Sequence, residues 1–389
     1  TGVQTCALPI LGVFMPFDIN KLLTEAHSLG VSDVHLQVGG APVVRKDGKI
    51  NRTNMPAITD EDMDSILSTI VPAGLKNRIL GLLDIDFAYE IPEVSRFRVN
   101  FSKHMGRIAL VIRVIPLVIP TLRELNVPST LERIASLNNG IVLVTGVAGS
   151  GKTTTIASIL EYINLNYAKH IITIEDPVEY VFEDKKSLFS QRQVDLDTAS
   201  FNDGLKYALR QDPNVIVIGE VRDEETVLSA IRAAETGHLV IATMHTIDAA
   251  QTVNRVLSFF DPAARENVKQ QFADLLMATF SQKLLPRKDG KGRIPAYELM
   301  MMTSTIKDFI LKDELEQVYQ MVKRGSHDEM ITFNTCIFNL LEQGLISEET
   351  AMEASTNKVE MGHYIKGVFH GTFNKNDTLP PSSSSKINL

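Results

Sequence analysis

The stretch Gly146–Thr154, "GVAGSGKTT", limits the possible folds more than any other part of this chain. An apolar run, "GIVLVT", leads into it, and a helix-forming run, "TTTIASILEYIN", follows it. The spacing fits the pattern G-x-x-x-x-G-K-[ST], in which glycines let backbone N–H groups and a helix N-terminus face a phosphate. We therefore predict a strand, a phosphate-binding loop and a helix in this order.

Side chains of this loop are expected to contact a nucleotide and its metal ion. Lys152 would reach the β- and γ-phosphates, and the Thr153 hydroxyl would bind Mg²⁺. A glycine turn before a purely structural helix is the alternative, and the flanking strand and helix argue against it. The candidate nucleotide-binding residues of the loop are Gly146, Gly149, Ser150, Gly151, Lys152, Thr153 and Thr154.

Four continuous apolar runs after Leu131 predict a parallel β-sheet. They read "GIVLVTG", "HIITIED", "NVIVIGE" and "HLVIATM", and helical segments alternate with them. Strands have such runs when crossover helices cover both faces of the sheet. We predict an α/β fold here, with a mainly helical chain after about Asp261.

The first part of the chain predicts a smaller α+β domain. The runs "IDFAYEI", "RFRVNFS" and "RIALVIRVI" suit a small antiparallel sheet. Prolines at 116, 120 and 128 indicate a linker, and the Ser/Pro-rich end indicates a disordered tail. The predicted segments are a non-native leader at 1–14, the α+β domain at 15–115, the linker at 116–130, the α/β domain with its helical part at 131–365 and the tail at 366–389.

Composition excludes several classes of protein. Lys and Arg total 39 against 47 Asp and Glu, and this net charge of −8 argues against broad binding to nucleic acid. Cys6 and Cys336 are too far apart to suggest a disulfide framework, which favours a reducing cytoplasm. No apolar run approaches the roughly 18 to 20 residues that span a bilayer. We expect a soluble cytoplasmic protein that binds no nucleic acid.

Two further apolar strands end in carboxylates. The strand in Asn214–Asp223 ends at Glu220, and the strand in Ile172–Tyr180 is stopped by Pro177 before Glu179. Hydrolysis of a phosphoanhydride needs one group to orient water and another to support the metal. We assign the water to Glu179 and the Mg²⁺ shell to Glu220; the two roles could be exchanged, and either carboxylate could belong to an ordinary acidic turn.

Two histidines flank one of the predicted strands, in "TGHLVIATMH". His238 and His245 would lie roughly 20 Å apart at its ends, which excludes a shared metal ion or a direct proton relay. His245 would lie at the edge where the phosphates bind and sense the γ-phosphate or the catalytic water. His238 is a candidate for nucleotide binding, for a subunit or domain contact, or for a structural role.

Four motifs in order resemble one family. "GVAGSGKTT", "TIEDPVEY", "LRQDPNVIVIGEVRD" and "AAETGHLVIATMHT" are similar to the motifs of the secretion ATPase superfamily, most closely the PilT/PilU-type retraction ATPases of type IV pili. The similarity runs from about Met15 to about Ser355. It places Glu179 in the Asp box, Glu220 in the Walker B strand, and His238 and His245 in the His box.

The resemblance also implies an architecture and an activity. It implies a PAS-like N-terminal domain, a RecA-like ATPase domain and a ring-shaped homohexamer that hydrolyses ATP with Mg²⁺. Such a motor is cytoplasmic, lies at the inner membrane at the pilus base, engages the pilus platform protein and powers pilus retraction and twitching motility. A second retraction ATPase is a further expected partner.

Arginines of the N-terminal domain gain a role from the same resemblance. Arg96, Arg98, Arg107 and Arg113 lie on a predicted hairpin. In related motors such arginines reach nucleotide phosphates, some across the subunit boundary, and a guanidinium suits the charge that develops on the γ-phosphate. We favour Arg107 and Arg113 as catalytic; a solvated strand face or a set of salt bridges is the alternative.

Some features depart from the family pattern. PilT-type motors carry "AIRNLIRE" where this chain has "TIKDFILK", Thr305–Lys312, and the stretches "VDLDT" and "RKDGKGR" favour the PilU side. An accessory retraction ATPase is therefore an alternative. The motifs also fit a type II or type IV secretion or pilus-extension ATPase, a subunit that binds ATP without hydrolysis, and a P-loop kinase for a small molecule.

Overall fold

The computed structural model describes residues 17–46, 49–77, 79–115, 118–325 and 329–367. The expected leader and residues 368–389 of the expected tail lie outside these ranges, as do residues 116–117 of the expected linker. The chain forms two compact units. The first contains the chain up to Val118 together with Glu175–Val181 and Gln193–Asp197, and the second contains the rest.

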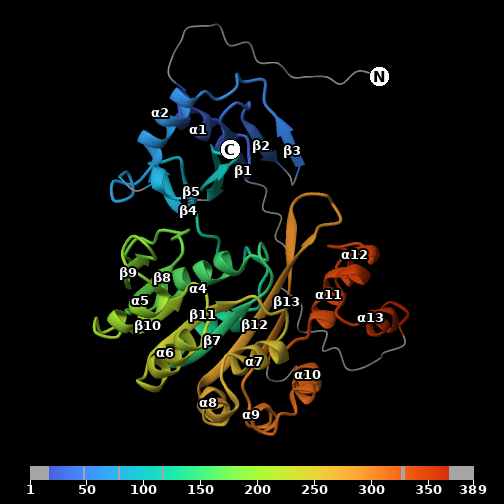
Figure 1. Ribbon diagram of the computed structural model, residues 1–389. Helices are drawn as coiled ribbons and strands as arrows, with labels where there is room; N and C mark the ends of the chain where they lie inside the picture. The colour runs from blue at the N-terminus through green and yellow to red at the C-terminus, as the bar shows by residue number, and fades with distance from the viewer. Residues whose placement is uncertain (1–16, 47–48, 78, 116–117, 326–328, 368–389) are drawn as a thin grey trace. The chain divides into compact units, whose positions relative to one another are not determined.

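The first unit is built on an antiparallel sheet, as the sequence predicted. The strand order is β3-β2-β1-β6-β5-β4, and each pair of neighbours runs antiparallel. In the described part of this unit, the helices α1 and α2 (Figure 1) and a short 3₁₀ turn accompany the sheet. The elements are α1 (Ile19–Ser28), β1 (Asp33–Gln37), β2 (Val43–Lys46), β3 (Lys49–Arg52), α2 (Asp60–Ile70), η1 (Ile79–Gly81), β4 (Asp84–Ile91), β5 (Ser95–His104) and β6 (Arg107–Ile115).

Apolar and polar side chains alternate along β5 and so occupy opposite faces of the sheet. Phe97, Val99 and Phe101 are fully buried in a core that also contains the apolar faces of α1 and α2. The residues that alternate with them, Arg96, Arg98 and Asn100, are only partly buried. Successive side chains of a strand point to opposite faces, so one face of the sheet packs on the helices and the other carries polar groups.

The second unit contains a seven-stranded sheet of order β13-β12-β7-β11-β10-β8-β9. Strands β12, β7, β11, β10 and β8 pair in parallel, and β12 and β13 pair antiparallel. This mixed sheet with covering helices confirms an α/β fold. The strands are β7 (Gly140–Thr145), β8 (His170–Glu175), β9 (Leu188–Gln193), β10 (Val215–Ile218), β11 (Leu239–Met244), β12 (Leu276–Pro286) and β13 (Arg293–Met301).

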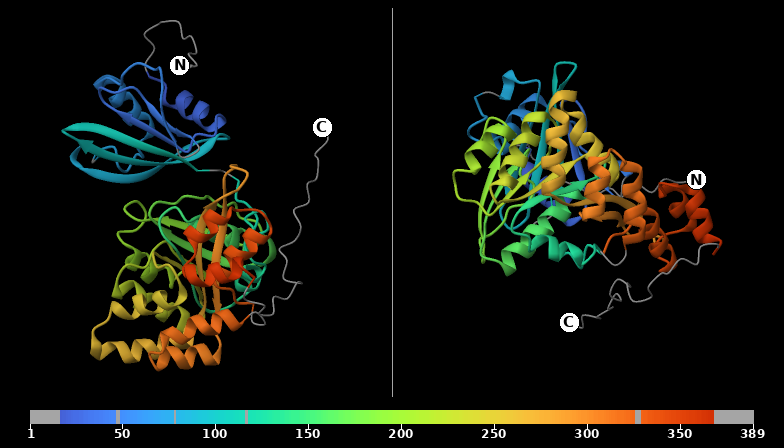
Figure 2. Two further views of the ribbon diagram at one scale, coloured as in Figure 1. Left: turned by 90° about the vertical axis from the view of Figure 1, so that its right-hand side faces the viewer. Right: turned by 90° about the horizontal axis from the view of Figure 1, so that it is seen from below.

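Helices cover both faces of this sheet. Side chains of α4 and α11 share a core with Val142 and Val144 of β7, whereas α6, α7 and α8 pack against Ile141 and Leu143 on the other face. In Figures 1 and 2 the red helices α11, α12 and α13 lie together beside the orange strands β12 and β13. The helices are α3 (Thr130–Ala135), α4 (Lys152–Asn166), α5 (Phe201–Ala208), α6 (Glu224–Glu235), α7 (Ala249–Ser258), α8 (Pro262–Leu275), α9 (Ser304–Leu311), α10 (Leu315–Arg324), α11 (Phe333–Glu342), α12 (Glu348–Ala354) and α13 (Lys358–Ile365).

The prediction of a mainly helical chain after Asp261 was wrong for the stretch from 276 to 301. This stretch forms the β12–β13 hairpin, whose register runs from Ala278 opposite Met301 to Pro286 opposite Arg293. Most residues of both strands are buried, so the sequence lacks the alternation that marks a half-exposed strand. Helices do follow the hairpin, from α9 to α13. Among the described residues, no helix is both long and apolar enough to cross a membrane.

Candidate nucleotide site

The loop between β7 and α4 has the backbone of a phosphate-binding loop. Gly146, Gly149 and Gly151 have φ values of 143°, 75° and 93°, which other L-residues rarely adopt. Gly151 is the N-cap of α4 and offers no side-chain cap, so the first N–H groups of the helix remain available to an anion. Lys152 Nζ donates to the carbonyl oxygens of Gly146, at 2.6 Å, and Val147, at 3.2 Å.

Ser150 supports the same interpretation. Its side chain is 2% exposed, and its hydroxyl has no hydrogen-bond partner within the described part of the chain. A buried hydroxyl is costly to leave unpaired, and a phosphate oxygen would supply an acceptor. The loop therefore fits the phosphates of a nucleotide.

Strand register brings two further predicted residues to the edge of the sheet that carries this loop. β11 lies between β7 and β10, and the N–H of Gly146 donates to Met244 O at 3.2 Å. His245 follows Met244 directly, and Glu220 follows the end of β10 by two residues. The P-loop, His245 and Glu220 therefore lie at the carboxyl ends of neighbouring parallel strands.

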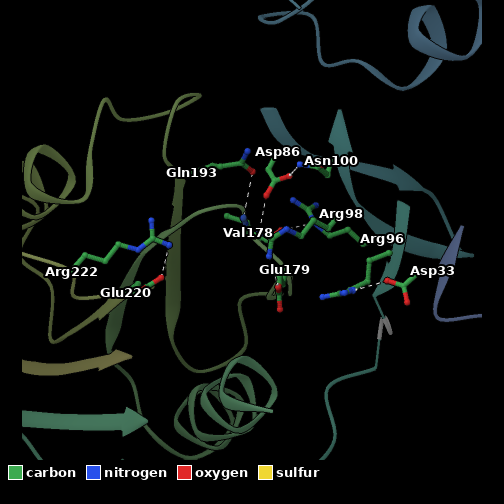
Figure 3. Close-up of polar contacts among 11 residues, drawn as sticks. Asp33, Asp86, Arg96, Arg98, Asn100, Val178, Glu179, Gln193, Glu220 and Arg222 are labelled. Carbon is green, nitrogen blue, oxygen red and sulfur yellow. Dashed lines mark hydrogen bonds and ion pairs between the residues drawn. The ribbon is translucent and has the colours of Figure 1, made fainter. Parts of the chain in front are cut away.

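Glu220 is held as a carboxylate by two basic side chains. Arg222 Nη2 lies 2.5 Å from one of its oxygens, as Figure 3 shows, and His245 Nε2 lies 3.1 Å from the other. Burial acts to raise the pKa of Glu220, but the hydrogen bond and charge of Arg222 and the contact with His245 outweigh it and lower this pKa. A charged carboxylate at this edge can support a metal shell or polarise water.

His238 lies at the other end of β11, so the structure does not bring it to the phosphate-binding loop of its own chain. Its carbonyl oxygen accepts from the N–H of Gly140, the first residue of β7, whereas the loop follows the last. Its Nδ1 lies 2.8 Å from Ala233 O and 3.0 Å from Thr236 Oγ1. The length of β11 therefore separates His238 from the loop of its own chain, and nucleotide binding by His238 stays a prediction.

Glu179 lies in the acidic segment Glu175–Val181, which belongs to the first unit. Arg98 Nη1 lies 3.4 Å from Glu179 Oε1, and Arg98 Nη2 lies 2.7 Å from Asp86 Oδ2 (Figure 3). Arg96 Nε donates to Val178 O at 3.2 Å. Two arginines on the polar face of the sheet thus hold this segment.

The charge of Arg98 is strongly favoured by these contacts. Burial acts to lower its pKa, but the hydrogen bond and charge of Asp86 and the charges of Glu179 and Asp176 raise it. Asn100 donates to the second oxygen of Asp86 at 2.8 Å, so the carboxylate is held on both sides. Arg98 is therefore a cation that pairs with both Asp86 and Glu179.

The sequence favoured Arg107 and Arg113 over Arg98, and the contacts of the first unit show a different distribution. Arg113 lies opposite Arg98 in the β5–β6 register, but its Nε donates to Asp33 Oδ1 at 3.0 Å and its side chain is 61% exposed. Arg107 is exposed at the turn of the hairpin, opposite His104. Within this unit, Arg98 and not the two favoured arginines contacts Glu179.

Residues 93–352 match the family of type II/IV secretion system proteins. The chain belongs to this family. It is 40% identical over 337 residues to the type IV pilus retraction ATPase PilT of Pseudomonas aeruginosa. This match covers 86% of this chain and 97% of that protein. It is 34% identical over 352 residues to the type IV pilus ATPase PilU of the same organism. This match covers 90% of this chain and 91% of that protein.

A solved structure agrees with these relatives. The crystal structure of the pilus retraction motor PilT with bound ADP matches this chain with a TM-score of 0.81 and a sequence identity of 41%. The match covers 89% of this chain and 99% of the chain in that structure. The chain is therefore a secretion-family ATPase of the PilT type.

Several residues around the site of this secretion-family ATPase were missed in the sequence. Arg222 stands two residues after Glu220 in "GEVRD", a spacing that could have indicated the ion pair. From β12, Ser281 contacts Thr145 at the end of β7, and Gln282 lies against Gly146 and Gly151 of the loop. No short motif marks these two residues, because β12 is distant in the sequence and was expected to be helical.

Proposed function

We propose that this chain is the ATP-hydrolysing motor of type IV pilus retraction. The single observation that carries the proposal is the edge of the second unit's sheet, where the phosphate-binding loop, His245 and the charged Glu220 end neighbouring strands. The relatives with the same motifs are pilus ATPases, and PilT is described with bound ADP. ATP is accordingly the substrate.

The loop residues would bind and orient the phosphates. Lys152 turns from the loop carbonyls to the β- and γ-phosphates, and the first N–H groups of α4 face the β-phosphate. Thr153 and, through water, Glu220 would hold Mg²⁺, which when bound neutralises charge on the phosphates. The other ligands of such an ion would be phosphate oxygens and water, as Mg²⁺ usually has at nucleotide sites.

Glu179 and His245 would act on the attacking water and the γ-phosphate. Glu179 accepts a hydrogen bond from water and orients it, while His245, beside Glu220, responds to the γ-phosphate. Arginines of the N-terminal domain would stabilise the charge that develops during cleavage, from the same or a neighbouring subunit. Arg96 and Arg98 join Arg107 and Arg113 as candidates because they lie on the same polar face.

The proposed assembly follows the family. A PAS-like domain at 15–115, a linker at 116–130 and a RecA-like domain at 131–365 would form the subunit of a cytoplasmic homohexamer. The ring would act at the inner membrane on the pilus platform protein, and domain closure around ATP would drive pilin disassembly.

The PilT role is favoured over the accessory PilU role by overall identity. The chain is 40% identical to PilT and 34% identical to PilU, although the segment Thr305–Lys312 departs from the PilT pattern. A strain that lacks the gene is the test. The PilT role predicts lost twitching and excess surface pili, restored by the wild-type gene but not by Lys152→Ala. Normal retraction in the deletion strain would contradict it and point to an accessory or secretion role.

A further inference from the structure

Strand β12 runs alongside β7 up to the start of the phosphate-binding loop. Ser281 is the register partner of Thr145, the last residue of β7, and their hydroxyls lie 2.8 Å apart with both side chains fully buried. Gln282 therefore stands next to Gly146. A Cβ on Gly146 would lie 2.4 Å from the carbonyl oxygen of Gln282, so this backbone approach requires glycine.

The side chain of Gln282 spans the first turn of α4. It is 3% exposed, and its Oε1 accepts from the Thr155 hydroxyl at 2.7 Å. Its Nε2 would lie 2.8 Å from a Cβ on Gly151, the N-cap of α4. Thr155 N–H in turn donates to Gly151 O at 3.0 Å. One buried amide therefore contacts both ends of the turn that contains Lys152 and Thr153.

We propose that Gln282 is a positioning residue for ATP hydrolysis, which fixes the first turn of α4 against the phosphates through Thr155 and Gly151. The inference rests on the proposed ATPase activity and extends it to β12, which lies outside the four motifs found in the sequence. Gln282 touches neither substrate nor metal. It acts because a buried amide with its acceptor satisfied has one low-energy position, and small displacements of reacting groups are costly.

Two substitutions remove the same hydrogen bond from opposite ends. Gln282→Met keeps the length of the side chain without the amide, and Thr155→Val keeps the shape without the hydroxyl. Each is expected to lower kcat at saturating ATP roughly 10- to 100-fold. The double variant is expected to be no slower than the worse single variant, because both act through one contact. Thr155→Ser restores the hydroxyl and should recover most of the turnover.

Thr279→Val is the matched control. Thr279 is a fully buried residue of the same strand, its hydroxyl has no hydrogen-bond partner in the described ranges, and its register partner is Leu143 in the middle of β7. This variant should keep wild-type turnover. If Gln282→Met and Thr155→Val lower the melting temperature while kcat at 25 °C stays within about twofold of the wild type, their role is only structural and the proposal is overturned.

ADP binding separates this inference from the proposed function. A wild-type protein that does not hydrolyse ATP would overturn the proposed function. The inference is then decided by titration of full-length protein with fluorescent ADP. Roughly tenfold weaker binding in Gln282→Met and Thr155→Val, with Thr279→Val unchanged, supports it, and unchanged affinity in all variants overturns it.

Discussion

The phosphate-binding loop and the acidic segment Glu175–Val181 are positioned by different kinds of interaction. The loop follows β7 and is fixed by backbone register, glycine conformation and the buried contacts of β12. The acidic segment is held by Arg96 and Arg98, whose side chains are 17% and 31% exposed. Backbone ladders tolerate few alternatives, whereas partly exposed ion pairs contribute about 1 kcal/mol or less each. The first region is therefore expected to be rigid and the second readily rearranged.

The largest expected effect comes from Glu220, at the edge of the sheet that carries the phosphate-binding loop. Glu220→Gln removes the charge that Arg222 and His245 stabilise and should lower kcat about 100-fold or more, with ATP affinity changed far less. Phosphate release under saturating ATP and equilibrium nucleotide binding measure the two quantities. A proportional loss of affinity and turnover would show that Glu220 serves ground-state binding and would weaken the proposed division of roles.

Protonation of Glu298, on β13 of the same sheet, should change the stability of the second unit with pH. Its carboxylate accepts from the N–H of Ala249 at 3.0 Å, at the start of the helix that follows the His245 loop, and from the backbone of Phe333. Burial raises its pKa from 4.5 to about 7, helped by the charge of Asp248 and opposed by these hydrogen bonds and by Lys283. Between these two pKa values the folded state binds more protons than the unfolded state. Stability from this group is thus full below 4.5 and is lost as the pH rises through about 7.

The corresponding variant is Glu298→Gln. From pH 5 to pH 8 the wild type should lose about 2 to 3 kcal/mol more unfolding free energy than this variant does. Denaturant unfolding of both proteins at the two pH values measures the difference. Parallel pH dependence in both proteins would show that Glu298 titrates at an ordinary pKa in the folded state.

Much of the rigid region could be predicted from the sequence. Continuous apolar runs indicated four parallel strands, and the ends of those runs placed Glu220 and His245 at one edge, because parallel register aligns strand ends. The same argument separated His238 from His245. The β12–β13 hairpin could not be predicted in this way, since most residues of its strands are buried and their sequence resembles that of a buried helix segment. Gln282 was missed with it.

The acidic segment was less predictable. Alternation in "SRFRVNF" does place Arg96 and Arg98 on one face, but the choice among four arginines depends on which partner each one meets. Asp33 binds Arg113, and Asp86 and Glu179 bind Arg98. These pairs join residues up to 81 positions apart, so spacing within one hairpin does not determine them.

Arg98→Ala should have an intermediate effect. Loss of the guanidinium leaves Glu179 and Asp86 without their shared cation and should lower kcat about tenfold, a smaller effect than that of Glu220→Gln. Arg113→Ala is the matched comparison, because the two arginines are register partners and Arg113 contacts Asp33 instead. Steady-state ATP hydrolysis by both variants measures which arginine contributes more to kcat. A larger loss in Arg113→Ala would favour the arginine chosen from sequence, acting on the nucleotide of a neighbouring subunit.

The smallest effect is expected from Asp86→Asn. Asp86 and Arg98 are 27% and 31% exposed, so the loss of this ion pair should destabilise β4 and β5 by about 1 kcal/mol or less. Amide hydrogen exchange in these two strands reports the change locally. A loss above about 2 kcal/mol would show that the arginine network is as rigid as the phosphate-binding loop.

The central claim is that the loop and the edge of its sheet form a working ATPase site. The most direct measurement is phosphate release by the purified full-length chain in Mg²⁺ and ATP, without any added acceptor, compared with Lys152→Ala. We predict steady turnover in the wild type and at least about 100-fold less in the variant, because in the proposed mechanism Lys152 binds the phosphates that react. ATP binding with no wild-type turnover, or turnover that requires an added acceptor molecule, would contradict the account.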